Sequence, residues 1–502
     1  MAIETTTYDH IIGGSRYAGQ GDRVADVYDP ATGATMRRVR LASEADADAA
    51  VASAAKAYES WAEASVTARS RVMYAFRQLL VEHETDLAEV ISAEHGKTID
   101  DARGEVVRGR EVVEFACGVP ELLKGEYSDQ VSTGVDTFTF RQPLGVVAGI
   151  TPFNFPAMVP LWMHPIAIAT GNTFVLKPSE RVPGASDLIA RLYAEAGLPA
   201  GVFNVLHGDR VAVDALLRHR DVAAVSFVGS TPVARYVHQT ASAAGKRVQA
   251  LGGAKNHAVV MPDADLDHAA RQILAAAYGS AGQRCMAISA VLAVGGIADE
   301  LVAKLRDLTL GLRVGPGTSP DSDLGPVISP VARDRVVGYV DQAERDGADV
   351  VVDGRGTTVP GHDEGFFVGP TLLDRVSSTM SAYQDEVFGP LLCVLRVPSL
   401  GTALELVNAN PYGNGTAVFT ASGGVARTFQ RQVKAGMVGV NVPVPVPMAF
   451  HSFGGWKDSR FADHHIHGPE GVRFYTQAKV VTTRWPERAD RGSTGFAFPT
   501  AS

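Results

Sequence analysis

Short apolar runs alternate with helical patterns through the middle of the chain. Near-continuous apolar runs lie at 146–150, 173–176, 202–206, 222–228 and 247–251, with helical segments between them. Such runs are typical of strands that are buried on both faces of a parallel sheet, and the alternation with helices predicts βαβ units. A sheet of this kind binds its ligands at the carboxyl ends of its strands.

A second α/β series begins after residue 250. It has an apolar run at 257–261, a helix from about Asp265, and further runs at 288–294, 350–352, 391–397 and 416–420. The fold class predicted from this pattern is therefore α/β, with two sheets. No fixed-period repeat and no long linker interrupts the two series.

Helices and two-faced strands flank these series. Ser43 is a candidate N-cap, a second helix follows Thr67 and ends at Gly96, and a third covers about 100–123. Polar and apolar residues alternate within 127–141 and again within 472–485. This alternation predicts strands with two different faces, in an antiparallel or edge position.

Composition and charge exclude several classes of protein. The chain has 502 residues, 46% of them hydrophobic, and a net charge of −9 without a long basic run, which argues against disorder and against a nucleic-acid partner. Prolines interrupt the most apolar stretch, 142–178, so it does not predict a membrane span. The first residues lack the pattern of a targeting peptide, and we expect a cytoplasmic protein. The polar tail 487–502 is expected to be loosely ordered.

Three cysteines are too few for a disulfide framework and fit a reducing compartment. Cys117 and Cys393 lie in a helical and an apolar strand segment, so both are expected in the core. Cys285 follows Gly282 and stands next to Arg284, whose charge would lower the pKa of the thiol and favour the nucleophilic thiolate. A buried structural cysteine is the alternative.

Polar residues follow several of the predicted parallel strands. Asn154, after the first run, is either a helix N-cap or an amide that donates to an oxyanion. Lys177 and Glu180, after the second run, form either an exposed pair or a ligand clamp. Gly229 and Ser230 precede a helix with proline at its first position, which favours phosphate binding at the helix N-terminus. The sequence contains no GxGxxG fingerprint.

Taken together, these segments resemble the aldehyde dehydrogenase family, from about residue 8 to 486. The resemblance rests on five ordered motifs, at 151–156, 177–180, 227–231, 283–285 and 386–390. It implies an NAD-binding domain at 1–125 and 146–250, a catalytic domain at 251–440, and an oligomerisation flap at 126–145 and 465–486. It also implies a homotetramer built as a dimer of dimers.

The resemblance assigns a role to each candidate residue. Cys285 is the nucleophile and Asn154 holds the oxyanion, while no residue is expected to bind a metal. The residues implied in NAD binding are Thr151, Phe153, Lys177, Glu180, Arg181, Gly229, Ser230, Gly252, Glu386 and Phe388. Glu180 would accept the ribose hydroxyls and repel a 2′-phosphate, which favours NAD over NADP.

One departure from the family pattern bears on the reaction. Hydrolytic members carry a glutamate directly before Leu-Gly-Gly, where it activates water, and Ala250 stands at that place here. Without this base, a thiol such as coenzyme A is a better acceptor than water for the acyl group on Cys285, because the pKa of a thiol already allows some thiolate near neutral pH. The alanine would also leave room for a bulky acceptor.

The residues around the motifs most resemble those of the CoA-acylating semialdehyde dehydrogenases of the family. In that group two arginines hold the substrate carboxylate; Arg284 matches one and Arg108 the other, with Arg110 as an alternative to Arg108. Two rival hypotheses remain open at this point. One is a hydrolytic semialdehyde dehydrogenase, and the other is a non-catalytic binding protein on the same scaffold.

Overall fold

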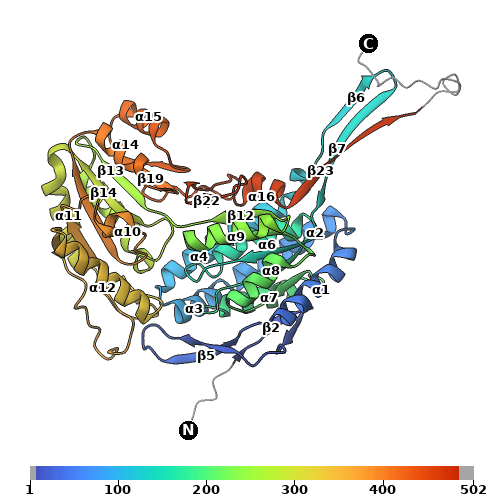
Figure 1. Ribbon diagram of the computed structural model, residues 1–502, viewed down its shortest axis with the longest axis horizontal. Coiled ribbons are helices and arrows are strands. Elements are labelled where there is room, and N and C mark those ends of the chain that lie inside the picture. The colour runs from blue at the N-terminus through green and yellow to red at the C-terminus, as the bar shows by residue number, and fades with distance from the viewer. Residues whose placement is uncertain (1–6, 486–502) are drawn as a thin grey trace, which may run out of the picture.

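Two large sheets form the body of the protein, and a narrow antiparallel sheet projects from it (Figure 1). The computed structural model describes residues 7–485. The α/β fold class predicted from the sequence is confirmed. The predicted tail 487–502 lies outside the described residues.

The first sheet has eight strands in the order β22-β12-β11-β8-β9-β10-β2-β3. Its parallel centre consists of β8 (Val146–Ile150), β9 (Thr173–Lys177), β10 (Phe203–Val205), β11 (Val222–Val228) and β12 (Arg247–Leu251). Antiparallel strands complete the edges: β2 (His10–Ile12), β3 (Ser15–Tyr17) and β22 (Arg460–Phe461). The predicted apolar runs are thus strands, and the strand order reverses between β8 and β11, where open α/β sheets bind ligands.

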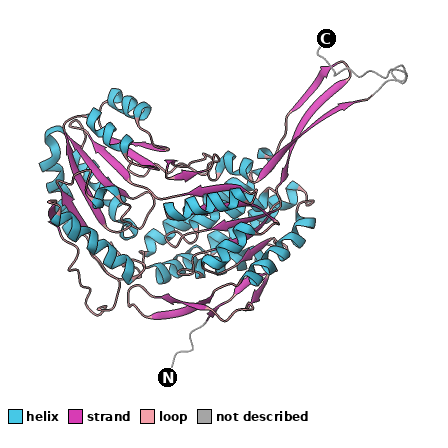
Figure 2. Cartoon of the chain, in the orientation of Figure 1, coloured by secondary structure: helices cyan, strands magenta, loops and turns pink. Residues whose placement is uncertain are grey.

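Helices cover both faces of this sheet (Figure 2). Val146, Ala148 and Ile150 pack against α1 (Glu44–Trp61), α8 (Arg210–Arg218) and α9 (Thr231–Ala243). Val147 and Phe174 lie on the opposite face, which is covered by α2 (Val66–Glu82), α3 (Glu84–His95), α4 (Ile99–Cys117), α6 (Met158–Ala169) and α7 (Gly184–Glu195). Burial on both faces explains why the strands are almost entirely apolar.

The second sheet has seven strands in the order β15-β16-β17-β14-β13-β19-β20. Its parallel strands are β13 (Asn256–Val260), β14 (Ile288–Val294), β16 (Thr371–Asp374), β17 (Leu391–Val397), β19 (Gly415–Phe419) and β20 (Met437–Val440), and β15 (Asp349–Val352) is antiparallel. Its helices are α10 (Leu266–Tyr278), α11 (Ala298–Leu310), α12 (Pro330–Arg345), α13 (Ser381–Gln384), α14 (Leu400–Ala409) and α15 (Gly423–Gln432).

A short crossing joins the two sheets. β12 ends at Leu251 and β13 begins at Asn256, so the carboxyl edge of the first sheet leads directly to the amino edge of the second. Loops that leave strands of the first sheet therefore meet loops that enter strands of the second. Most of the candidate residues lie on these loops or at the ends of the strands beside them, whereas Arg108 lies on helix α4.

The predicted helices at 43–124 form, but with different breaks. Ser43 caps α1 as predicted, since its hydroxyl accepts the N–H of Asp46. The single helix predicted from Thr67 to Gly96 is wrong: Ser65 caps α2, and His83 leaves helical geometry (φ −104°, ψ 20°) before α3. Gly96 then ends α3 in the left-handed conformation (φ 90°). The helix predicted over 100–123 is also divided, because α4 ends at Cys117 and the short α5 (Val119–Leu122) contains a proline.

The projecting sheet is three-stranded, in the order β23-β7-β6 (Figure 1). It consists of β6 (Tyr127–Ser132), β7 (Val135–Pro143) and β23 (Thr476–Arg484), so the predicted segment 127–141 is a hairpin. The strand predicted from residue 472 begins only at Thr476, because 468–474 forms helix α16 (Gly468–Phe474). The domain boundaries given above stay a prediction.

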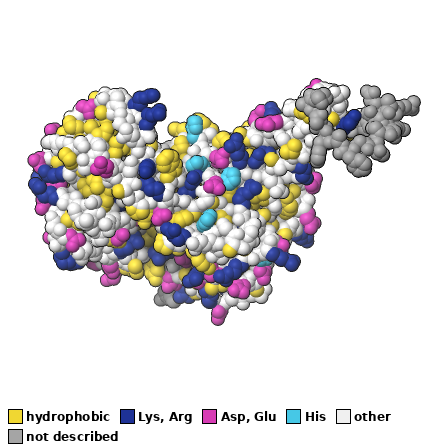
Figure 3. Space-filling view, turned by 45° about the horizontal axis from the view of Figure 1, so that its top comes forward, with side chains coloured by type: hydrophobic (Ala, Val, Ile, Leu, Met, Phe, Trp, Pro, Cys, Tyr) yellow, Lys and Arg dark blue, Asp and Glu magenta, His cyan; other side chains and the backbone are white. Residues whose placement is uncertain are grey.

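Small elements near the two ends of the chain were not predicted. β1 (Thr7–Tyr8), β5 (Thr35–Arg40) and β4 (Val24–Tyr28) form a three-stranded sheet, and β18 (Tyr412–Gly413) pairs with β21 (Trp456–Lys457). Among residues 7–485, no helix has the length and apolar character needed to cross a membrane. On the face shown in Figure 3, cationic and anionic side chains are interspersed rather than gathered by sign.

Candidate functional site

The predicted cofactor-binding residues lie at the carboxyl edge of the first sheet. Thr151 follows β8, Lys177 ends β9, Gly229 follows β11 and Gly252 follows β12. β8 and β11 are neighbours, so the turn at 151–156 and the start of α9 flank the point where the strand order reverses. A nucleotide is expected to bind at this place in an open α/β sheet.

Lys177 and Glu180 are not the exposed pair of the alternative interpretation. Lys177 is buried, its Nζ donates to the carbonyl oxygen of Gly208 (2.9 Å), and it lies 3.5 Å from a carboxylate oxygen of Glu180. Burial lowers the pKa of Lys177, and the Glu180 carboxylate opposes this shift. Glu180 is partly exposed and Arg181 is exposed. The carboxylate is therefore available to hydroxyl groups of a ligand.

The start of α9 is bound to the crossing between the sheets. Ser230 is the N-cap residue, but its hydroxyl makes no capping bond, and Pro232 occupies the second helical position rather than the predicted first. The hydroxyl of Thr231 accepts the N–H of Gly253 (2.8 Å). A Cβ at Gly253 would lie 2.4 Å from Oε2 of Glu386, so a side chain there would displace this carboxylate.

Asn154 is a buried anchor and not a helix cap. α6 begins at Met158 with Ala157 as its N-cap, so the capping alternative is wrong. The side-chain amide of Asn154 donates to the carbonyl of Gln283 (3.0 Å), two residues before Cys285. Its own backbone carbonyl accepts a hydrogen bond from Nζ of Lys97 (2.6 Å). The turn after β8 and the loop of Cys285 are thus in direct contact.

The loop before Cys285 has an unusual backbone. Ser280 (φ 54°), Ala281 (φ 51°) and Gly282 (φ 69°) are all left-handed, which is rare for residues with a side chain. A Cβ at Gly282 would lie 2.1 Å from the carbonyl oxygen of Gly389, so only glycine fits there. The approach to Cys285 is therefore a specific, strained turn.

The environment of the thiol differs from the prediction. Burial, together with the nearby Glu386 carboxylate, raises the pKa of the Cys285 thiol to about 12. The backbone N–H groups of Cys285 and Met286 oppose this shift, and the positive charge of Arg284 opposes it least. Arg284 is paired with Asp101, so its charge is largely engaged. Arg284 thus lowers the pKa of the thiol as predicted, but burial and Glu386 outweigh its effect.

Glu386 and Phe388 lie in the same cavity as Cys285. Oε1 of Glu386 accepts the N–H of Ala254 (3.0 Å), and burial raises the pKa of Glu386 to about 7. Phe388 is left-handed (φ 56°) and packs edge-on against Phe153, with ring centroids 5.9 Å apart. These contacts join the loop before β17 to the turn after β8. Among the described residues that line this cavity, Glu386 is the only carboxylate.

The structure distinguishes Arg108 from Arg110. Arg110 forms ion pairs with Glu84 (2.5 Å) and Glu114 (3.7 Å), away from the nucleophile loop. Arg108 instead donates to the carbonyl of Pro447 (2.7 Å) and pairs with Glu111 (2.6 Å). Arg110 is thus held by two carboxylates, whereas Arg108 is held by one carboxylate and the backbone of the loop at Val446 and Pro447. The choice of Arg108 over Arg110 as a carboxylate ligand stays a prediction.

Ala250 is not among the described residues that line the cavity of Cys285. Its side chain is fully buried in the apolar cluster on the α1, α8 and α9 side of the first sheet, and its backbone pairs with Phe461. Leu251, the next residue of β12, belongs to the cluster that also contacts Cys285. The predicted room for a bulky acceptor at Ala250 is therefore wrong. The conclusion that no carboxylate stands there is unaffected, since Leu251 has none either.

Sequence reasoning missed several charged residues behind the site. Lys97 and Glu105 are fully buried and form an ion pair (2.7 Å). Asp101 lies one helical turn before Glu105 and contacts the nucleophile loop. The available signal was the spacing of Asp101, Glu105 and Arg108, which places three charged residues on one face of a helix. The predicted core positions of Cys117 and Cys393 are confirmed, as both are buried.

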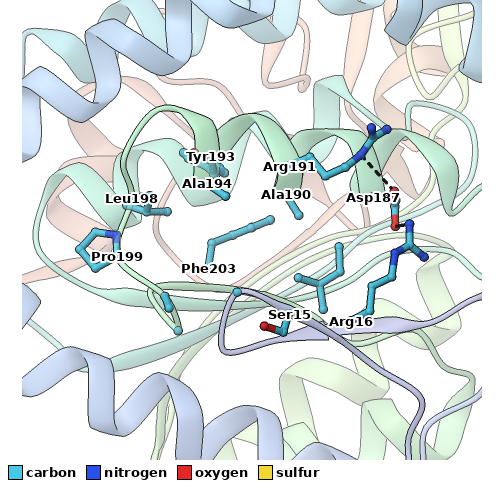
Figure 4. A pocket seen from close by; sticks show the side chains of 14 residues that line it. Ser15, Arg16, Asp187, Ala190, Arg191, Tyr193, Ala194, Leu198, Pro199 and Phe203 are labelled. Carbon is cyan, nitrogen blue, oxygen red and sulfur yellow. Dashed lines mark ion pairs between the residues drawn. The ribbon is translucent and has the colours of Figure 1, made fainter.

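A second cavity lies away from these residues (Figure 4). It is formed between the β2–β3 hairpin, α7 and Phe203, and Asp187 pairs there with Arg16 and Arg191 at 3.4 Å each. It contains none of the candidate residues. Among residues 7–485, no group of three or more His, Cys, Asp or Glu side chains is arranged to hold a metal ion.

The chain belongs to the aldehyde dehydrogenase family, which matches residues 17–481. It is 54% identical to a malonate-semialdehyde dehydrogenase of Pseudomonas aeruginosa, an alignment that covers 98% of this chain and 99% of that protein. Malonate-semialdehyde dehydrogenase 2 of Geobacillus kaustophilus is 48% identical and covers 97% of this chain and 100% of its own.

Solved structures agree with this assignment. The methylmalonate-semialdehyde dehydrogenase of Oceanimonas doudoroffii has a TM-score of 0.95 at 53% identity and covers 97% of this chain and 100% of its own. A protein of Sinorhizobium meliloti 1021, solved in complex with NAD, has a TM-score of 0.96 at 50% identity, with 97% and 99% covered. The family predicted from the motifs is confirmed, and the chain is an aldehyde dehydrogenase.

Proposed function

We propose that this aldehyde dehydrogenase oxidises malonate semialdehyde or methylmalonate semialdehyde with NAD, and transfers the acyl group to coenzyme A with loss of CO2. The products are acetyl-CoA or propionyl-CoA and NADH. The single observation that carries this proposal is the cavity around Cys285. It combines a thiol and an adjacent arginine, and its one carboxylate is bound to Ala254. The names of the relatives support the choice of substrate.

The residues at the carboxyl edge fit an NAD molecule. The partly exposed Glu180 carboxylate and the buried Lys177 would hold the adenosine ribose, and the start of α9 at Ser230 would face the phosphates. Glu386 and Phe388 would hold the nicotinamide ribose. NAD supplies the nicotinamide ring that accepts a hydride. Thr151, Phe153, Arg181, Gly229 and Gly252 complete the proposed cofactor contacts.

In the proposed acylation step, the thiolate of Cys285 adds to the aldehyde carbon. The oxyanion accepts hydrogen bonds from the side chain of Asn154 and the backbone N–H of Cys285. The bond from Asn154 to Gln283 fixes the plane of the amide in advance. Loss of the aldehyde hydride then leaves a thioester on Cys285. Arg108 and Arg284 hold the substrate carboxylate during this step.

The thioester carries a carboxylate on the carbon next to its carbonyl. The C–C bond to this carboxylate breaks, CO2 leaves, and the electron pair forms an enolate that takes up a proton. The thiolate of coenzyme A then attacks the thioester carbonyl and Cys285 leaves as thiolate. A thiol needs less help from a base than water does, because its pKa lies nearer to neutrality.

The deciding experiment is an assay of the purified enzyme with malonate semialdehyde and NAD, with and without CoA. The proposal requires a burst of one NADH per active site without CoA and rapid steady turnover with it. Acetyl-CoA and CO2 should form in equal amounts. Rapid turnover to free acid without any thiol would contradict the proposal.

One observation favours hydrolysis as a second candidate. Burial raises the pKa of Glu386 to about 7, which is suitable for a base near neutral pH. Water would then replace CoA as the acceptor, and the CoA-free assay would show full turnover. The bond from Ala254 to Glu386 speaks against this role, since it directs the carboxylate toward the crossing.

The projecting sheet supports a proposal about assembly. Tyr127 on β6 and Val480 on β23 are 63% and 64% exposed on a sheet that projects from the body, and this exposure supports a contact with another chain. We include in the proposal a homotetramer in which β6, β7 and β23 contact another copy. A cytoplasmic role in valine or inositol breakdown is also part of the proposal.

A further inference from the structure

We propose that Asp101 and Glu105, one turn apart on α4, are positioning residues. They would hold two segments in register: residues 279–285, here called the nucleophile loop, and residues 151–157, here called the oxyanion turn. The inference rests on the proposed roles of Cys285 and Asn154. It concerns residues that would not touch the substrate or the cofactor. Their effect on the reaction passes through the backbone of the two loops.

Asp101 holds the nucleophile loop at two points. One carboxylate oxygen accepts the backbone N–H of Ser280 (2.7 Å), and the other is paired with the guanidinium of Arg284. Ser280 and Arg284 lie five residues and one residue before Cys285. A single carboxylate thus spans the segment that leads to the nucleophile.

The backbone held by Asp101 is strained. Ser280 and Ala281 have left-handed φ values of 54° and 51°, and such residues persist only where their surroundings fix them. The carboxylate of Asp101 accepts the N–H at the start of this turn, and the backbone carbonyl of Gly389 packs closely against Gly282. Without the carboxylate, the turn would lose the bond that opposes its relaxation.

Glu105 holds the oxyanion turn in the same way. Oε1 accepts the N–H groups of Ala157 (2.8 Å) and Met158 (3.1 Å) at the start of α6. Oε2 lies 2.7 Å from Nζ of Lys97, which in turn donates to the carbonyl of Asn154 (2.6 Å). Glu105 and Lys97 are fully buried, so this network is not weakened by solvent.

The two carboxylates lie on one rigid element. Asp101 binds a loop that enters the second sheet, and Glu105 binds a turn that leaves the first sheet. Their spacing on α4 therefore fixes the distance between the two loops. The bond from Asn154 to Gln283 joins the loops directly and requires this distance to be maintained. A shift of either loop would misplace the amide relative to the thiol.

The test uses isosteric variants of the full-length enzyme. Asp101→Asn and Glu105→Gln are compared with Asp100→Asn, which removes the same charge from an exposed neighbour on α4. Stopped-flow absorbance gives the rate constant of the NADH burst with malonate semialdehyde and with propanal. Hydrogen–deuterium exchange of residues 278–286 and 153–160 reports on the two loops without any substrate.

We expect both variants to slow the burst roughly ten- to a hundredfold with either aldehyde. The amide oxygen can keep the backbone N–H bonds, but its NH2 group then faces Arg284 in Asp101→Asn and Lys97 in Glu105→Gln. Each network therefore loses its charged contact, and small misplacements of reacting groups are costly. NAD affinity should stay close to the wild-type value. Exchange should increase at 278–286 in Asp101→Asn and at 153–160 in Glu105→Gln. The KM for malonate semialdehyde should not rise in Asp101→Asn, since Arg284 keeps its charge. A wild-type burst, or effects no larger than those of Asp100→Asn, would overturn the proposal.

Glu105→Gln leaves Lys97 buried without a counter-ion and could fail to fold. In that case Lys97→Met combined with Glu105→Gln removes both charges, and it should fold and still show the slow burst. A double variant with a wild-type burst would also overturn the proposal. If the wild-type enzyme proves independent of CoA, the proposed function fails, whereas the propanal burst and the exchange data still decide this inference.

Discussion

The side-chain amide of Asn154 donates a hydrogen bond to the backbone carbonyl of Gln283, 3.0 Å away. Asn154 follows a strand of the first sheet, and Gln283 precedes a strand of the second. One N–H of the amide is used for this contact, which leaves the other for an oxyanion. The proposed catalytic arrangement therefore depends on how the two sheets meet.

Cys285→Ala should abolish NADH formation and leave NAD affinity largely intact, because the nucleophile does not hold the cofactor. The burst of NADH and the Kd for NAD are the two measurements. Cys117→Ala is the matched control, since Cys117 is a buried core residue at the end of α4. If Cys285→Ala keeps more than about one per cent of the wild-type turnover, Cys285 is not the nucleophile.

Glu386→Gln should slow hydride transfer by loosening the nicotinamide ribose. The amide can still accept the N–H of Ala254 through its oxygen, so the loop should keep its place. The rate constant of the burst should fall while its amplitude stays at one NADH per site. An unchanged burst rate would show that Glu386 does not hold the cofactor.

Glu386 should also make stability depend on pH. Burial raises its pKa from 4.5 to about 7, so the folded protein keeps a proton that the unfolded chain releases. Stability from this group is full below pH 4.5 and is lost as the pH rises through 7. The Tm of Glu386→Gln relative to wild type should therefore increase between pH 5 and 8. Burial also raises the pKa of Glu94 to about 7. Glu94 is present in both proteins, so its contribution cancels in the difference between the two Tm values.

Arg108→Leu and Arg284→Leu should each raise the KM for malonate semialdehyde far more than the KM for propanal. A charge-assisted hydrogen bond is worth about 1.5–3 kcal/mol, which corresponds to roughly a ten- to hundredfold effect. Arg110→Leu is the control, because Arg110 is committed to Glu84 and Glu114. Equal losses with both aldehydes would mean that Arg108 and Arg284 serve the structure and not the carboxylate.

Much of the fold could be predicted because apolar strands buried on both faces leave a clear pattern, as in β8, β9 and β11. The break at His83 and the helix at 468–474 were not predictable, since helical spacing alone does not show where a helix bends or ends. Cys285 and Asn154 were found through their motifs. Asp101, Glu105 and Lys97 were not, because a buried carboxylate on a helix has the same local sequence as an exposed one until its partners are known.

β7 pairs with β23 over its full length, from Val135 opposite Arg484 to Pro143 opposite Thr476. The two strands are far apart along the chain; Arg141 and Thr476, which share a hydrogen bond, are separated by 335 residues. At the usual pace of translation, β7 leaves the ribosome roughly 15–70 s before its partner strand is made. During that time its edge is unpaired, and a bare edge invites pairing with other chains. The yield of this enzyme should therefore depend more strongly on the rate of synthesis and on the crowding of nascent chains than on the stability of the folded protein.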